Sequence, residues 1–234
     1  MTDKIKVTHV IFDLDGVILE TESIFAKIGE EIAEEYGKQY TEDMKVKVMG
    51  TPEPESIRIM MEELKLPITR EEFVEKYITK VNLYTQSPEL MPGVEELIRH
   101  LHCSGVPLAV ATSSNQDQFR TKTQNYKDLM SLFEHVVCSG TDPEVQKGKP
   151  HPDVFQVAAK RFPGKPCPCK VLVFEDSPNG VAAAKTAGMR VVMIPNPTLP
   201  EDNPWRKRAD QVIPTFYDLK LEMFDLPPLP EKRK

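Results

Sequence analysis

The sequence predicts an α/β protein in which helices cover both faces of a parallel sheet, with a separate helical lobe inserted near its beginning. Short apolar runs without alternating polar residues recur along the chain, and helical stretches with clear ends separate them. The segment from about residue 20 to 87 has no convincing run of this kind and is rich in charge. Together these observations favour a layered core with an insertion.

Five β-branched apolar runs are the predicted strands. A sheet with one solvated face alternates apolar and polar residues, whereas strands buried on both faces read as continuous apolar runs. The second pattern holds here and is typical of parallel strands between two helical layers. The runs span residues 7–12, 106–111, 135–138, 171–174 and 191–194.

Two helices between these runs have clear start and stop signals. Pro92 and Gly93 precede the segment VEELIRHLH, which ends before Gly105. Ser177 as N-cap and Pro178 at the first helical position begin the segment NGVAAAKTA. Strands and helices therefore alternate along the core, as they do in an α/β layered sheet.

The inserted lobe is predicted from apolar residues that repeat at helical spacing within a charged segment. Thr69 and Glu72 form an expected capping box ahead of its last helix. We therefore expect a catalytic core of residues 1–18 and 88–234, and an inserted helical domain of residues 19–87.

Composition excludes several classes of function. Acidic and basic residues are interspersed and the net charge is −6, so no basic patch is expected for nucleic acid or an anionic membrane. The first residues lack the apolar core of a signal sequence, and no apolar run approaches membrane-spanning length. The 4 cysteines are too sparse for a disulfide framework. We expect a cytoplasmic monomer whose partner is a small molecule.

Polar residues suited to one reaction follow the predicted strands or lie in the loops after them. The carboxyl ends of parallel strands meet at one edge of the sheet, which is where ligands bind in open α/β sheets. We therefore expect these side chains to lie close together. They are Asp13 and Asp15; Thr112, Ser113 and Ser114; Lys147 and Lys149; and Glu175 and Asp176.

Several carboxylates at one edge indicate a cation site, because they cannot all be charged beside a single lysine. A few oxygen ligands with room for water suit Mg²⁺. A calcium EF-hand loop would need glycine and glutamate where this chain has Ile18 and Ile24. A hairpin turn at Asp15 and Gly16 would explain the glycine, but neither the second acidic pair nor the lysine.

The same residues suit phosphoryl transfer. Hydroxyls and backbone N–H groups at Thr112 and Ser113, with a lysine opposite, form a cradle for phosphate. One carboxylate can attack phosphorus to give an aspartyl-phosphate. A second carboxyl can protonate the leaving oxygen and then deprotonate the incoming water. In the stretch FDLDG, one aspartate is thus the nucleophile and its neighbour two residues on is the acid/base.

The segments DLDGV, ATSS, GKPHPD and FEDSPNGVAAAKTAG resemble, in their usual order, the four motifs of the haloacid dehalogenase-like hydrolases. The resemblance covers nearly the whole chain. It implies a Rossmann-like parallel sheet core with helices on both faces and an inserted helical cap domain. It also implies that Asp13 is the nucleophile and that Asp15 is the general acid/base.

The resemblance further implies roles for the other residues at this edge. Thr112, with Ser113, would bind the phosphoryl group, and Lys149 would hold it against the nucleophile. Lys147 competes for the second role, but the Gly-Lys-Pro context favours Lys149. Mg²⁺ would be bound by the Asp13 carboxylate, the Asp15 backbone carbonyl and Asp176, with Glu175 behind them.

Within that superfamily, the segments LMPGVEELIRHL, ATSSNQDQF and DPEVQKGKPHPDVF resemble the eukaryotic pseudouridine-5′-phosphatases. This implies Mg²⁺-dependent hydrolysis of a small phosphomonoester, with pseudouridine 5′-phosphate as the expected substrate. The alternatives are a phosphatase of another sugar, polyol or flavin phosphate, or a phosphosugar mutase of the β-phosphoglucomutase type. From a different class comes a non-catalytic binding protein, although every motif residue is present.

The inserted domain is expected to select the substrate, because it would cover the site and exclude water. Expected contacts near the junction of the two parts are Glu20, Thr21, Glu22 and Arg58. Many relatives have aspartate at position 20, and the longer glutamate side chain changes its reach. An equally good hypothesis places Glu22 and Arg58 on solvated helix faces, without a role in substrate binding.

Overall fold

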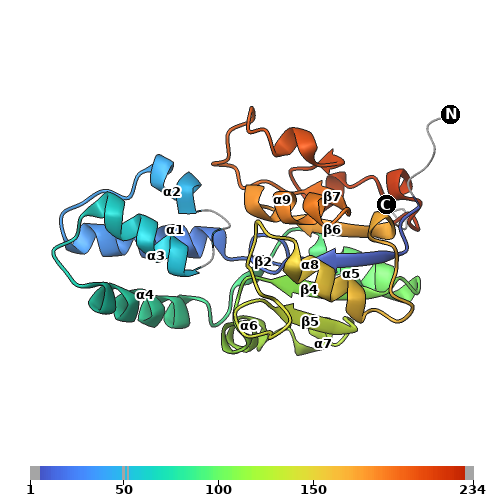
Figure 1. The fold of residues 1–234 in the computed structure, drawn as a ribbon, viewed down its shortest axis with the longest axis horizontal. Coiled ribbons are helices and arrows are strands. Elements are labelled where there is room, and N and C mark those ends of the chain that lie inside the picture. The colour runs from blue at the N-terminus through green and yellow to red at the C-terminus, as the bar shows by residue number, and fades with distance from the viewer. Residues whose placement is uncertain (1–5, 49–50, 52, 230–234) are drawn as a thin grey trace, which may run out of the picture.

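The computed structural model describes residues 6–48, 51 and 53–229, and its core is a parallel sheet (Figure 1). The sheet has 6 strands in the order β5-β4-β1-β6-β7-β8, and every neighbouring pair is parallel. Five of the strands coincide with the predicted apolar runs, so the α/β class is confirmed. The strands are β1 His9–Phe12, β4 Leu108–Thr112, β5 His135–Cys138, β6 Val171–Glu175, β7 Arg190–Met193 and β8 Gln211–Val212.

Two apolar layers enclose the sheet, and the alternation of side chains along the strands assigns residues to each layer. In β1, Val10 and Phe12 face the layer formed with α5, α7 and the C-terminal 3₁₀ turns. Ile11, between them, faces the layer formed with α8 and α9. The core helices are α5 Val94–Cys103, α6 Gln116–Thr123, α7 Lys127–Met130, α8 Asp153–Arg161 and α9 Pro178–Thr186.

Four helices form a second unit beside the sheet, and they share an apolar cluster of their own (Figure 1). The chain passes between the two units through the two-residue strands β2 (Leu19–Glu20) and β3 (Glu89–Leu90), which pair antiparallel. Strands this short leave no periodic pattern in the sequence, so they were not predicted. The helices are α1 Glu22–Glu35, α2 Glu42–Val48, α3 Glu53–Leu64 and α4 Arg70–Tyr84.

The predicted helix starts are present. The Thr69 side chain accepts from the backbone N–H of Glu72, whose carboxylate accepts from Thr69, which completes the capping box of α4. Ser177 caps α9 by accepting from the backbone N–H of Gly180 at 3.0 Å, and Pro178 is the first helical residue. None of the described helices combines the length and apolar character needed to cross a membrane.

Candidate active site

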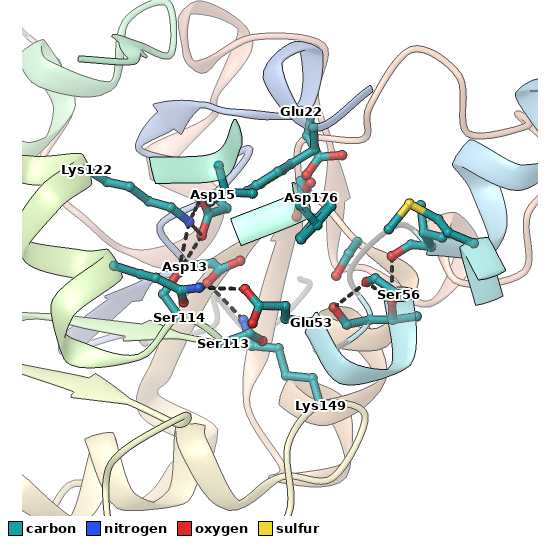
Figure 2. A pocket seen from close by; sticks show the side chains of 18 of the residues that line it. Asp13, Asp15, Glu22, Glu53, Ser56, Ser113, Ser114, Lys122, Lys149 and Asp176 are labelled. Atoms are coloured by element: carbon teal, nitrogen blue, oxygen red, sulfur yellow. Dashed lines mark hydrogen bonds and ion pairs between the residues drawn. The ribbon is translucent and has the colours of Figure 1, made fainter. Parts of the chain in front are cut away.

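Most of the polar residues that follow the predicted strands line one cavity between the carboxyl edge of the sheet and the four-helix unit (Figure 2). Asp13 directly follows β1, and its backbone N–H donates to Phe174 at the end of the neighbouring strand β6. Thr112 ends β4 and Glu175 ends β6, and Asp176 follows directly. The parallel register therefore delivers these residues to a single edge.

Lys149 is a buried cation of this site. Its Nζ lies 2.6 Å from Glu175 Oε1 and 2.9 Å from Asp13 Oδ1, and 4.9 Å from the centre of the Phe155 ring. Burial disfavours the ammonium, but Asp13 and Glu175 outweigh it and raise the pKa of Lys149. Lys147, the competing lysine of the loop, is exposed.

Glu175 is held by hydrogen bonds from its own loop in addition to Lys149. Its Oε2 accepts from the backbone N–H groups of Asp176 and Ser177 and from the Ser177 hydroxyl, each at 3.0 Å. A Cβ at Gly180 would lie 1.8 Å from the Glu175 carboxyl carbon, so this helix position needs glycine. The carboxylate thereby anchors both Lys149 and the turn into α9.

Asp13 and Asp176 have the properties of cation ligands. Ligand oxygens of Asp13, Glu175 and Asp176 all lie within 4.8 Å of one another. Asp13 Oδ1 is buried, and Lys149 Nζ lies 2.9 Å from it. A Cβ at Gly16 would lie 2.3 Å from Asp176 Oδ2, so glycine lets this carboxylate approach the first loop.

The pKa values of these carboxylates are consistent with a site for a cation. Burial, together with Glu175 and Asp15, outweighs Lys149 and raises the pKa of Asp13 to about 7. Burial and the neighbouring carboxylates Glu22 and Glu175 raise the pKa of Asp176 well above its usual value. A divalent cation would reverse this by favouring the charged carboxylates. An all-oxygen set of this kind fits Mg²⁺.

Asp15 faces the same cavity but has a different environment. Its oxygens accept from Lys122 Nζ at 2.7 and 3.0 Å, from the Thr21 hydroxyl at 2.8 Å and from the Ser114 hydroxyl at 3.1 Å. Burial alone would raise the pKa of Asp15, but Lys122 and these hydrogen bonds outweigh it and lower the pKa. Asp13 and Asp15, two residues apart, thus differ in proton affinity.

Lys122 was not predicted from the sequence. It is buried, donates to the Ser114 hydroxyl at 3.0 Å, and lies 5.1 Å from the centre of the Phe25 ring in α1. The helical spacing could have predicted that Lys122 points inward. It stands three residues after Phe119 in α6 and therefore lies on the same face, which packs against the core. The surrounding polar sequence obscured it.

Of the residues expected to form the phosphate cradle, some line the cavity and one is buried behind its surface. Ser113 and Ser114 line the cavity. Thr112 is fully buried beneath them, and its hydroxyl oxygen accepts from the backbone N–H of Ser114 at 3.1 Å. Thr112 therefore shapes the turn that presents the two serines.

The residues expected near the junction of the two units have different surroundings. Thr21 binds Asp15, and Glu22 lines the cavity, where burial and the charges of Asp15 and Asp13 raise its pKa to about 7. Glu20 instead accepts hydrogen bonds from Ser23 within its own turn and is not among the residues that line the cavity.

Arg58 lies outside the cavity that holds Asp13. The Arg58 side chain is half exposed on α3 and forms ion pairs with Glu55 at 2.6 Å and Glu62 at 2.7 Å. It lines a different surface depression from the one that holds Asp13. The residues of α3 that line the site cavity are Glu53, Ser56 and Met60, none of which was predicted.

Comparisons with known proteins agree with this site. A model of the haloacid dehalogenase-like hydrolases matches residues 10–194. A probable pseudouridine-5′-phosphatase of Drosophila melanogaster is 46% identical over 222 residues, 95% of this chain and 95% of the fly protein. (DL)-glycerol-3-phosphatase 2 of Arabidopsis thaliana is 44% identical over 95% of this chain and 92% of that protein. The crystal structure of a putative β-phosphoglucomutase from Thermotoga maritima aligns with a TM-score of 0.69 at 31% identity, over 88% of this chain and 94% of that one.

A parallel sheet with buried carboxylates at its carboxyl edge, matched by a hydrolase family model, identifies the protein as an enzyme of the α/β class. The chain belongs to the haloacid dehalogenase-like hydrolases, as its four motifs predicted. The predicted enzyme class, a phosphoric monoester hydrolase, is confirmed by relatives named as phosphatases that match nearly the whole chain. The predicted resemblance to pseudouridine-5′-phosphatases is confirmed as well.

Proposed function

We propose that this enzyme hydrolyses a small phosphomonoester with the help of Mg²⁺, and that pseudouridine 5′-phosphate is its substrate. The observation that carries the reaction is the buried Asp13 carboxylate, which lies 2.9 Å from Lys149 Nζ, clusters with Asp176 and stands two residues before Asp15. The choice of substrate is supported by the 46% identity to the probable fly pseudouridine-5′-phosphatase.

The proposed reaction has two steps. Asp13 attacks phosphorus to form an aspartyl-phosphate, while Lys149 stabilises the negative charge and Asp15 protonates the leaving oxygen. Asp15 then takes a proton from water, which attacks phosphorus and restores Asp13. Mg²⁺, when bound by Asp13, the Asp15 carbonyl and Asp176, would neutralise charge on the phosphoryl oxygens. Glu175 holds Lys149 in place, and Ser113 and Ser114 line the space for the phosphoryl group.

Lys122 bears on the order of these steps. Because Lys122 holds Asp15 in its charged form, the described arrangement is the one that the second step requires, in which Asp15 acts as a base. For the first step Asp15 must carry a proton. We propose that the substrate, once bound beside Asp15, weakens the contact with Lys122.

We also propose that residues 19–87 act as a cap over this edge. The cavity is lined from both units, and closure would exclude water during phosphoryl transfer. Thr21 belongs to the connection between the units and binds Asp15 directly, so movement of the cap would change the surroundings of the acid/base. The cytoplasmic location, the monomeric state and the lack of nucleic-acid or membrane partners stay predictions.

Phosphate release from a panel of esters tests the proposed function. The panel contains pseudouridine 5′-phosphate, uridine 5′-phosphate, flavin mononucleotide, glycerol 3-phosphate and glucose 6-phosphate, each with Mg²⁺ and with a chelator. We expect release that the chelator abolishes and added Mg²⁺ restores, with the highest kcat/KM for pseudouridine 5′-phosphate. Preference for another ester would contradict the proposed substrate but support the proposed reaction. No release from any ester would contradict the proposed function.

A further inference from the structure

The part of the cavity formed by the four-helix unit, here called the cap half, has an unusual charge distribution. Among its described lining residues, Glu22 and Glu53 carry ionisable carboxylates and the others have neither acidic carboxylates nor basic groups. Residues 49, 50 and 52, which lie outside the described chain, are Met, Gly and Pro in the sequence. The lysines that line the cavity, Lys149 and Lys122, belong to the core and are ion-paired with carboxylates.

From this distribution we propose that the cap half binds a neutral, hydroxyl-bearing leaving group and rejects a second phosphate. The inference rests on the proposed function and deepens it, because it specifies the charge of the group that the cap half accepts. A mutase must hold a sugar bisphosphate with one phosphate at the nucleophile and the other in the cap half. There the described lining offers the carboxylates of Glu22 and Glu53 and no cation, and like charges brought together away from water are strongly unfavourable.

Glu53 is positioned to read hydroxyl groups. Its Oε2 accepts from Gln118 Nε2 at 2.6 Å, a contact that joins α3 of the cap to α6 of the core. The orientation of the Gln118 amide is fixed, because Gln118 Oε1 accepts from the backbone N–H of Asn115 at 3.0 Å in a capping box. No described residue donates a hydrogen bond to Glu53 Oε1. That oxygen is therefore an acceptor for a hydroxyl of the substrate, which a phosphate dianion cannot replace.

The rest of the cap half favours an uncharged body for the same substrate. Phe25, Tyr40, Met60 and Tyr77 line it, and they offer apolar surface to a ring. The hydroxyls of Thr51 and Ser56 lie 2.6 Å apart at the same wall. A small group with a ring and several hydroxyls can contact both the apolar side chains and the hydroxyls. A second phosphate would find no cation among the described lining residues of the cap half, and the helix α3 that reaches this wall begins with a carboxylate, Glu53.

A binding experiment on a protein that cannot turn over tests this inference. In the Asp13→Asn background, calorimetry with Mg²⁺ compares glucose 6-phosphate with glucose 1,6-bisphosphate, and the same pair is measured after adding Glu53→Lys. We expect the bisphosphate to bind at least about tenfold more weakly than the monophosphate. Glu53→Lys should raise affinity for the bisphosphate at least about tenfold, because it replaces a repelling charge by an attracting one. Glu53→Gln should give a smaller gain in the same direction.

The control is Glu62→Lys, which makes the same charge change on the exposed side of α3, outside the cavity. It should leave both affinities unchanged. Tighter binding of the bisphosphate before substitution, or no gain with Glu53→Lys, would overturn the inference. Hydrolysis of p-nitrophenyl phosphate by the wild-type enzyme is measured alongside. Its absence would contradict the proposed function, while the binding ratios would still decide the inference.

Discussion

Asp13→Asn is expected to lower kcat for the best phosphomonoester by about a thousandfold or more, as loss of an enzyme's nucleophile generally does. The amide keeps the shape of the side chain but cannot form an aspartyl-phosphate. The fold should survive. Burial, with the nearby carboxylates, raises the pKa of Asp13 to about 7, so the charged form destabilises the metal-free protein. That cost grows as the pH rises from about 4 to about 7, and asparagine removes it.

The measurements are steady-state phosphate release with Mg²⁺, and thermal unfolding in metal-free buffer at about pH 4 and about pH 8, which lie at or beyond the two ends of that range. We expect the melting temperature of Asp13→Asn to be at least that of wild type at the higher pH. Asp117→Asn, at an exposed position of α6, is the control and should change neither quantity. Activity of Asp13→Asn near the wild-type level would remove Asp13 from the role of nucleophile.

Lys149→Met should affect both activity and stability. Methionine leaves Asp13 and Glu175 buried without their cation, and breaking a buried pair in this way costs about 3–5 kcal/mol of unfolding free energy. Removal of one preorganised electrostatic group lowers kcat about a hundredfold to a thousandfold. Denaturant unfolding without metal and phosphate release with Mg²⁺ measure the two effects.

Two further variants separate the effects of Lys149→Met. The double variant with Glu175→Gln removes one uncompensated charge, so it should regain part of the lost stability while activity stays low. Lys147→Met, in the same loop but exposed, should resemble wild type in both measurements. A reversal, with Lys147→Met inactive and Lys149→Met active, would exchange the roles of the two lysines.

The parallel sheet could be predicted because its strands are buried on both faces, which leaves continuous apolar runs in the sequence. All five runs became strands, with ends shifted by at most a few residues. The remaining strands, β2, β3 and β8, have two residues each, and their existence depends on pairing partners distant in the sequence. No local pattern could have revealed them.

The core of the site was predictable for a related reason. Asp13, Glu175 and Asp176 directly end or follow strands, so the order of the strands alone brings them together. Lys122 and Glu53 come from helices, where a charged residue usually indicates a solvated face. Whether such a side chain points inward depends on how its helix packs. The same uncertainty applies to Arg58, whose charge is engaged in ion pairs with Glu55 and Glu62 on α3.

The central claim, phosphoryl transfer to Asp13 followed by hydrolysis with Asp15 as base, can be tested in the Asp15→Asn variant. A good leaving group needs little help from an acid, so p-nitrophenyl phosphate should still phosphorylate the variant. Without a base, the phosphoenzyme should accumulate. With Mg²⁺, we expect a burst of one p-nitrophenolate per enzyme, followed by slow turnover, and a peptide that carries phosphate on Asp13. Linear turnover without a burst, or phosphate on another residue, would contradict this account.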